Sequence, residues 1–282
     1  MTHKLLTLYS LKWNPFSPDV PVEALWTPAK LDHFRWRMEQ QVREGGFALI
    51  TGDPGTGKSV TLRLLAHHLA MLPDIEVGVL TRPQSGLNDF YRELGTLFGV
   101  VLAPHNRWAG FKALREKWLA HVGATHLRPV LLVDEAQEMH PDILGELRIL
   151  ASTDFDSRAI LTLVLAGDGR LVEQFRREEL LPIASRIRVR LSLDYLTPKE
   201  LLEWLRHVLD QAGNPNLMTP ELMTTLAEHA AGNLRVLSIM ASDLLALAAR
   251  RDLRQLDQKL YLEMYTQQPR PKSRTLENPA RT

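Results

Sequence analysis

The stretch Thr51-Gly52-Asp53-Pro54-Gly55-Thr56-Gly57-Lys58-Ser59 decides how the rest of this sequence is interpreted. It fits the pattern G-x-x-x-x-G-K-S/T, in which glycines let successive backbone N–H groups point at a phosphate without an intervening Cβ. A helix that begins near Lys58 adds the positive end of its dipole. The lysine reaches the β- and γ-phosphates of a nucleotide, and the Ser59 hydroxyl takes a place on Mg²⁺. We therefore expect the phosphates to be bound by Gly52, Asp53, Pro54, Gly55, Thr56, Gly57, Lys58, Ser59 and Val60.

The residues on either side of this loop support the same interpretation. Phe47-Ala48-Leu49-Ile50 is a short apolar run of the kind that forms a buried strand. After the loop, Leu62, Leu65 and Leu69 recur at helical spacing. A glycine-rich turn with no ligand is the alternative. A strand before the loop and a helix after it are the context that a phosphate loop requires, and the sequence predicts both.

The composition is that of an ordinary globular chain, with 282 residues, 45% of them apolar, and a net charge of +1. So balanced a charge gives no overall nucleic-acid signature, and any DNA contact needs local basic patches. The absence of cysteine excludes disulfides, thiol catalysis and cysteine-based zinc sites. No run approaches the ~20 apolar residues of a membrane span, and the first residues lack the apolar core of a signal peptide. We expect a cytoplasmic protein with no membrane partner.

Apolar runs separated by amphipathic patterns predict a parallel sheet, because strands that are buried on both faces have continuous apolar sequences. The clearest run is Pro129-Val130-Leu131-Leu132-Val133. From Thr197 onward the pattern is helical only, and Thr197-Pro198-Lys199-Glu200 is a strong helix start. The predicted class is α/β, a parallel sheet sandwiched by helices and followed by a small all-α domain. The five strands are predicted at 47–50, 76–81, 129–133, 160–165 and 187–193.

The N-terminal segment is predicted to be a strap. Prolines 15, 18 and 21 exclude a helix between Leu6 and Pro28. The strap either packs on a domain surface or covers the base of a bound nucleotide, with Asn14 and Phe16 as contacts. The predicted domains are the strap at 1–28, the α/β nucleotide-binding domain at 29–195, the helical lid domain at 196–266 and a disordered basic tail at 267–282.

Two carboxylates follow the most apolar strand directly. Asp134 and Glu135 stand at its carboxyl end, where open α/β sheets bind their ligands. Asp134 can hold Mg²⁺ on the same face as Ser59, and Glu135 is placed to polarise a water for attack on a γ-phosphate. Solvated turn carboxylates are the alternative. The apolar run that leads into this acidic pair favours the catalytic interpretation.

Two arginines are candidate phosphate contacts. Arg186 lies at the entrance to the last strand, whose end faces away from its own site, so we expect it to act on a neighbouring subunit. A surface arginine is the alternative, and competing candidates nearby are Arg176, Arg177, Arg188 and Arg190. A guanidinium fixed near the γ-phosphate oxygens is worth ~10³–10⁵ in rate. Arg235 follows Gly232-Asn233-Leu234, where Gly232 ends one helix and Asn233 caps the next. An arginine there is unfavourable to the helix dipole, which favours a functional role over a surface position.

Asp168 is a less obvious case, because a carboxylate beside a γ-phosphate is repelled. A polar side chain at this strand end normally helps to place the attacking water. The simpler interpretation is that Asp168 caps the helix that begins at Gly169, and we favour it.

Taken together, the phosphate loop, the Asp-Glu strand end, the arginine before the last strand and Gly-Asn-x-Arg in a helical lid resemble an AAA+ ATPase. The resemblance covers about residues 5–265. Tyr9-Ser10-Leu11-Lys12-Trp13-Asn14-Pro15-Phe16 looks like the "FGL…NPF" stretch of the ExeA/GspA group, with Tyr9-Ser10 in place of Phe-Gly. Gly46-Phe47-Ala48-Leu49-Ile50-Thr51-Gly52 is similar to its "GF…LTG" entrance. Leu131-Leu132-Val133-Asp134-Glu135-Ala136-Gln137 matches its "DEAQ", whereas Gly167-Asp168-Gly169 replaces a Gly-Gln-Pro-like turn.

The resemblance implies an ATPase that uses ATP and Mg²⁺ and forms a ring or filament. The group contains secretion ATPases and free-standing transposon ATPases similar in role to TnsC, TniB, IstB and MuB. Because this chain stops after the lid, our main hypothesis is a regulator of DNA transposition, which assembles on double-stranded DNA and recruits a transposase, with a target-selection protein as a further partner. By the pattern of that group, DNA contacts Arg82, Lys112 and Arg115. The alternatives are a secretion or envelope-assembly ATPase and a signalling switch of the STAND kind.

Overall fold

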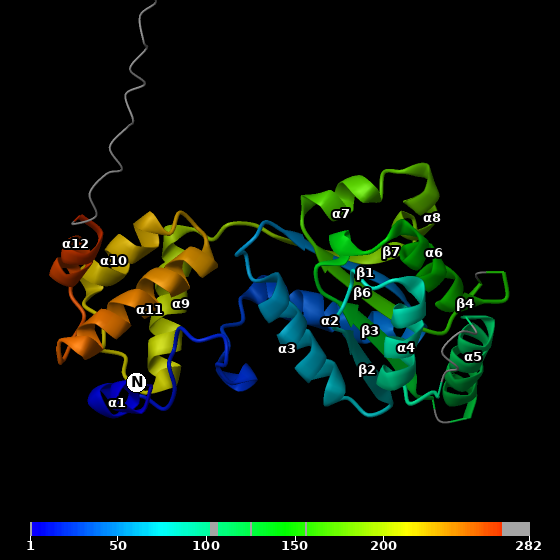
Figure 1. The fold of residues 1–282 in the computed structure, drawn as a ribbon, viewed down its shortest axis with the longest axis horizontal. Helices are drawn as coiled ribbons and strands as arrows, with labels where there is room; N and C mark the ends of the chain where they lie inside the picture. The colour runs from blue at the N-terminus through cyan, green and yellow to red at the C-terminus, as the bar shows by residue number, and fades with distance from the viewer. Residues whose placement is uncertain (1, 102–106, 125, 156, 267–282) are drawn as a thin grey trace, which may run out of the picture.

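The computed structural model describes residues 2–101, 107–124, 126–155 and 157–266, which form an α/β part and a helical part side by side (Figure 1). The α/β part contains one parallel sheet of five strands in the order β2-β3-β6-β1-β7. Its strands are β1 (Gly46–Gly52), β2 (Ile75–Leu80), β3 (Arg128–Val133), β6 (Thr162–Gly167) and β7 (Ile187–Leu193). The predicted α/β class and parallel sheet are therefore confirmed.

The register of the sheet brings several strand ends to one edge. β1 pairs with β6 so that Thr51 is opposite Gly167, and β3 pairs with β6 so that Val133 is opposite Leu165. The carboxyl ends of three neighbouring strands therefore share one level. Residues that follow β1, β3 and β6 must lie close together at this edge, although the ends of β1 and β6 are more than a hundred residues apart along the chain.

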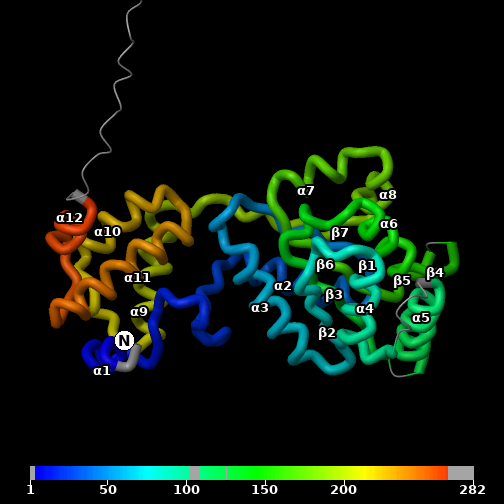
Figure 2. Tube along the Cα trace, in the orientation of Figure 1, coloured from blue at the N-terminus to red at the C-terminus, as the bar shows by residue number. Residues whose placement is uncertain are grey.

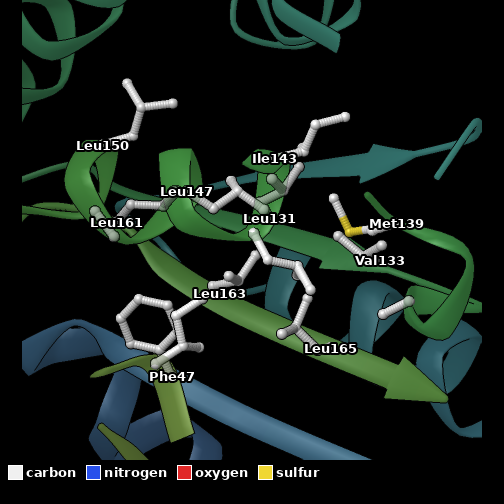
Figure 3. Close-up of a cluster of buried hydrophobic side chains, with 14 of the residues drawn as sticks. Phe47, Leu131, Val133, Met139, Ile143, Leu147, Leu150, Leu161, Leu163 and Leu165 are labelled. Carbon is white, nitrogen blue, oxygen red and sulfur yellow. The ribbon is translucent and has the colours of Figure 1, made fainter. Parts of the chain in front are cut away.

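Alternate strand residues point to opposite faces of the sheet, and each face has its own apolar core. On one face, Leu131, Leu163 and Leu165 pack with residues of the helices on that side (Figure 3). On the other face, Leu132, Val164 and further strand residues pack with two helices. The first face is covered by α4 (Leu87–Leu97), α5 (Arg107–Ala124), α6 (Pro141–Leu150) and α7 (Gly169–Gln174), and the second by α2 (Ala29–Glu44) and α3 (Lys58–Ala70).

Shorter elements complete the α/β part. They are the 3-10 turns η1 (Val22–Ala24), η2 (Ala136–Glu138) and η3 (Glu178–Leu180), the hairpin of β4 (Ser152–Thr153) and β5 (Arg158–Ala159), and α8 (Leu181–Ala184).

The helical part consists of α9 (Pro198–Ala212), α10 (Pro220–His229), α11 (Leu234–Arg250) and α12 (Gln258–Thr266). The predicted start of α9 is confirmed: Thr197 and Glu200 form a reciprocal capping box. Burial of apolar side chains from all four helices gives this part its own core. None of the helices in the described ranges is long and apolar enough to cross a membrane.

The N-terminal segment differs from the sequence prediction, which excluded a helix from Leu6 to Pro28. A helix, α1 (Thr2–Tyr9), forms and ends before the first of the three prolines. Tyr9 and Leu11 are buried in the core of the helical part, so α1 packs at that end of the molecule. The prediction was wrong because prolines restrict the residue before them and those after, but not a helix several residues earlier.

After α1 the chain crosses from the helical part to the α/β part (Figure 2). Arg63 on α3 donates hydrogen bonds to the carbonyl oxygens of Pro18 (2.8 Å) and Val20. His207 on α9 bonds to the carbonyl oxygen of Ala24 at 3.0 Å. Residues 10–28 are thereby attached to both parts. The tail predicted at 267–282 lies outside the described residues.

Candidate nucleotide site

The loop between β1 and α3 has a conformation that its glycines permit. Gly55 and Gly57 have φ angles of +89° and +98°, in the left-handed region that other residues rarely adopt. Thr56 closes the turn, because its hydroxyl donates to the carbonyl oxygen of Asp53 at 2.8 Å. A Cβ on Gly52 would lie 2.5 Å from the Thr56 Oγ1. The sequence of the loop therefore fixes a tight cradle of backbone N–H groups at the start of α3.

Lys58 is the buried cation of this cradle. Only 6% of the residue is exposed. Its Nζ donates to the carbonyl oxygens of Gly52 at 2.9 Å and Asp53 at 3.2 Å. The N–H groups of the first helical turn have no acceptor within the helix. The loop thus gathers a lysine charge and several N–H dipoles, which is the donor set that a polyphosphate requires.

A cleft of about 740 Å³ lies between the loop and the helical part. Its walls come from the strap, α2, α3, the linker after β7, α9 and α11. Among the residues that the sequence predicted for the site, its lining includes Phe16, Gly55, Thr56, Gly57, Lys58, Ser59, Val60, Glu135 and Arg235. The lining does not include Asn14, Gly52, Asp53, Pro54 or Asp134, all of which belong to the described part of the chain.

One end of the cleft is apolar and aromatic. Phe16 of the strap is buried, and its ring centroid lies 6.4 Å from that of Trp204 on α9. Asn14 does not enter the cleft but accepts a hydrogen bond from the Phe16 backbone N–H at 3.0 Å, which sets the turn that presents Phe16. Trp204 and Arg63, which anchors the strap, were missed by sequence reasoning. No local pattern distinguishes them from core or surface residues of a helix.

The two carboxylates that follow β3 stand at the edge where the phosphate loop begins. Asp134 Oδ1 accepts the backbone N–H of Glu135 at 2.9 Å. Glu135 has a φ of +49°, which is unusual for a residue with a side chain. It lines the cleft, and its Oε2 accepts a hydrogen bond from the side-chain amide of Gln137. Gln137 belongs to the "DEAQ" stretch but had no predicted role.

Asp168 directly follows β6 at the same edge and caps α7, as predicted, by accepting the Arg170 N–H at 2.9 Å. The Arg170 guanidinium binds it as well, with Nη2 2.9 Å from Asp168 Oδ2 and Nη1 2.9 Å from Glu138 Oε1. The hydrogen bonds and charge of Arg170 lower the pKa of Asp168, and the charge of Lys58 contributes in the same direction. Asp168 is therefore a paired carboxylate, held by an arginine that sequence reasoning did not single out.

The helical part reaches the phosphate loop through the first turn of α11. Asn233 caps α11 by accepting the N–H groups of Arg235 (3.0 Å) and Val236 (3.2 Å). Its side-chain amide also donates to the carbonyl oxygen of Pro54 at 3.1 Å. A Cβ on Gly55 would lie 2.2 Å from Asn233 Oδ1, so this contact requires glycine. The predicted cap is confirmed, and its direct contact with the phosphate loop is new. Arg235 is exposed on the wall of the cleft.

The other predicted basic residues lie elsewhere. Arg186 is not in the lining of its own chain's cleft, and its Nη1 donates to the carbonyl oxygen of Pro182. Arg115 Nη1 donates to the carbonyl oxygens of Ile149 (2.7 Å) and Ser152, so its guanidinium joins α5 to the end of α6. Lys112 is 3.7 Å from Glu116 on the same helix, and Arg82 is exposed after β2. The DNA contacts assigned to these last three residues stay a prediction.

The residues that line the cleft fit a nucleoside triphosphate with Mg²⁺. The glycine cradle leaves room for phosphate oxygens, and Lys58 and Arg235 supply positive charge. The Ser59 hydroxyl in the lining, and the Asp134 carboxylate that precedes Glu135 outside it, are oxygen donors of the type that Mg²⁺ prefers. The aromatic end, with Phe16 and Trp204, offers an apolar surface suited to a base.

Comparison with known proteins agrees with this geometry. Residues 41–175 match the family model described as an AAA domain. Over 212 residues the chain is 31% identical to general secretion pathway protein A of Aeromonas hydrophila, a match that covers 73% of this chain and 38% of that protein. The chain thus spans well under half of the length of this relative.

Solved structures resemble the chain over most of its length. Cdc6p from Pyrobaculum aerophilum has a TM-score of 0.67 at 17% identity, covering 86% of this chain and 67% of its own. The ORC2 protein of Aeropyrum pernix, in ADPNP–ADP complexes, has a TM-score of 0.69 at 14% identity. The match covers 90% of this chain and 71% of the ORC2 chain. Drosophila ORC bound to DNA has a TM-score of 0.63 at 19% identity. This match covers 93% of this chain and 66% of the matched ORC chain. At these identities the likeness is one of fold.

The Asp168–Arg170 pair makes a prediction about pH. In Arg170→Met, the pKa of Asp168 should rise toward that of an ordinary aspartate, because the hydrogen bond from Arg170 is the main cause of its lowering. The stability that the pair contributes is full above the unfolded pKa of about 3.9 and is lost as the pH falls through the lower folded pKa. Carboxyl NMR titration and denaturation at pH 7 and at low pH measure both effects.

Arg176→Met is the matched control. Arg176, just after α7, also pairs with a carboxylate, but its partner is the exposed Glu173 on α7 rather than Asp168. It should leave the Asp168 titration unchanged. An unchanged Asp168 pKa in Arg170→Met would contradict the assignment of Arg170 as its partner.

Proposed function

Because the chain has the AAA+ fold, with an AAA domain at residues 41–175, we propose that it binds ATP with Mg²⁺, hydrolyses it to ADP and phosphate, and works as a homo-oligomer. The observation that carries this proposal is the meeting of the phosphate loop with Asp134 and Glu135 at one sheet edge. A cleft that ends in an aromatic surface and is bounded by Arg235 supports it.

Each residue of the site has a role in this proposal. Lys58 and the N–H groups of its loop bind the β- and γ-phosphates, and Ser59 and Asp134 hold Mg²⁺. Bound Mg²⁺ would offset the charge of the phosphate oxygens. Glu135 orients a water and accepts its proton, since its carboxylate lines the cleft. Arg235 places a charge on the wall formed by the helical part, so nucleotide binding would favour closure of that part onto the loop.

Arg186 is proposed to act on the site of a neighbouring subunit. Its guanidinium is outside the cleft of its own chain, so a role in hydrolysis requires a second copy. Such an arrangement would make hydrolysis depend on assembly, because the arginine reaches the γ-phosphate only at a subunit contact.

The biological process is proposed from the similarity to general secretion pathway protein A. This similarity favours our alternative, an ATPase of a secretion or envelope-assembly system, over the transposition hypothesis. The resemblance to structures of DNA-binding proteins is one of fold and does not favour DNA as a partner of this chain. The regulation of transposition therefore stays a prediction that experiment can test directly.

The ATPase proposal predicts that two substitutions separate binding from hydrolysis. Glu135→Gln should keep the affinity for ATP and lower kcat by about 10²–10⁴-fold, because it removes the general base. Lys58→Ala should lose ATP binding, because it removes the buried cation of the cradle. Fluorescent-nucleotide titration and phosphate release measure the two steps. The control is Glu173→Gln, an exposed carboxylate on α7. Normal hydrolysis in Glu135→Gln would show that Glu135 is not the general base.

The role of Arg186 predicts complementation between two inactive variants. Arg186→Ala keeps its own ATP site, and Lys58→Ala keeps its arginine, so a mixture restores complete sites at some subunit contacts. Phosphate release by the mixture should exceed that of either variant alone. Arg188→Ala, which breaks a surface pair with Glu44, should be active by itself. If the mixture recovers no activity, another residue supplies the charge.

The partner is tested by sedimentation with and without duplex DNA, in the presence of a slowly hydrolysed ATP analogue. The secretion proposal predicts nucleotide-dependent assembly that DNA does not change at low salt. The transposition hypothesis predicts salt-sensitive filaments on DNA, and Arg82→Ala or Lys112→Ala would then each reduce the salt slope by about 1. Filaments of that kind would overturn the secretion proposal and leave the ATPase proposal standing.

A further inference from the structure

We propose that Gln137 is a positioning residue, whose side-chain amide holds the Glu135 carboxylate in the orientation that hydrolysis requires. This inference rests on the proposed ATPase function. It assigns a role to the last residue of Asp134-Glu135-Ala136-Gln137, which otherwise would be only a polar residue in a 3-10 turn.

Gln137 is buried and bound from three directions. Only 5% of the residue is exposed. Its Nε2 donates to Glu135 Oε2, and its Oε1 accepts the backbone N–H of Asp168 at 3.3 Å. Its carbonyl oxygen accepts a hydrogen bond from Gln174 Nε2 at 2.9 Å. A buried amide that satisfies both its donor and its acceptor has a fixed orientation, because flipping the group would break both bonds.

The surroundings leave the Gln137 side chain little freedom. A Cβ on Gly167 would lie 2.6 Å from Gln137 Oε1, so the end of β6 must be glycine for the amide to sit there. The Gln137 side chain therefore links the ends of two strands. It donates to Glu135, which follows β3, and accepts from Asp168, which follows β6. The position of the amide is set by the sheet rather than by solvent.

The hydrogen bond from Gln137 fixes how the Glu135 carboxylate is oriented, which packing alone would not do. Glu135 is exposed and has a left-handed backbone where it precedes the 3-10 turn that contains Gln137. Gln137 binds one carboxylate oxygen. Within the described residues, no protein donor binds the other oxygen, Oε1, which stays available to a water in the cleft. The amide thus orients the carboxylate without competing for the oxygen that accepts the proton.

Gln137→Glu tests this role with a minimal change of shape. The substituted side chain keeps an oxygen for the Asp168 N–H but replaces the donor to Glu135 with a second carboxylate. We expect kcat to fall about 10–100-fold, as for other residues that orient a catalytic group. KM and the affinity for a slowly hydrolysed ATP analogue should be unchanged, because no phosphate contact is removed. A crystal structure of the variant without nucleotide should show Glu135 in a changed or disordered rotamer.

Two further variants separate positioning from stability. Gln41→Glu is the matched control: Gln41 is buried to a similar degree, 6% exposed, and donates to the carbonyl oxygen of Phe47, away from Glu135. It should lower the melting temperature as Gln137→Glu does but leave kcat unchanged. In a Glu135→Gln background, Gln137→Glu should cause no further loss of kcat, because the two residues act as a unit.

The outcomes distinguish this inference from the function on which it rests. If Glu135→Gln abolishes hydrolysis but Gln137→Glu changes only the melting temperature, the positioning role is wrong and the ATPase proposal stands. An equal loss of kcat from Gln137→Glu in both backgrounds would likewise overturn the role. If the unaltered chain neither binds nor hydrolyses ATP, the proposed function itself fails.

Discussion

The parallel pairing of β1, β3 and β6 is the constraint on which the rest of the site depends. Each of these strands is apolar on both faces and is buried between two layers of helices, which is typical of parallel sheets. The register then places the residues after each strand at one level. Lys58, Glu135 and Asp168 come together for this reason, and no contact among the loops themselves is needed to bring them there.

The helical part adds a second requirement, because the cleft exists only while both parts face each other. Asn233 joins its helix cap to the carbonyl oxygen of Pro54, and Gly55 leaves the space for this contact. At the other end, the strap is bound by Arg63 of one part and His207 of the other. The angle between the parts is therefore coupled to the loop at one end and to the strap at the other.

Sequence reasoning succeeded where the physics is local or periodic. The strand segments, the cap at Thr197 and the cap at Asp168 follow from burial patterns and turn chemistry. It failed for α1, because the prolines from Pro15 onward were taken to exclude a helix that ends several residues before them. It also missed Arg63, Arg170 and the contact of Gln137 with Glu135. These depend on which side chains the folded sheet brings together, and a single sequence carries no periodic signal for such pairings.

The charges at the phosphate end of the cleft show how three carboxylates can surround a site for an anion. Asp168 alone would repel a γ-phosphate, but Arg170 binds it through both carboxylate oxygens, so its charge is offset within the protein. Among the residues that the structure describes, no arginine or lysine forms an ion pair with Asp134 or Glu135. Asp134 accepts a backbone N–H, and Glu135 accepts the side-chain amide of Gln137, so the donors to both carboxylates are neutral groups. Within the described residues, the arginine therefore binds Asp168, which has no proposed chemistry. The two carboxylates with proposed roles, Asp134 for the metal ion and Glu135 for the proton, accept neutral donors.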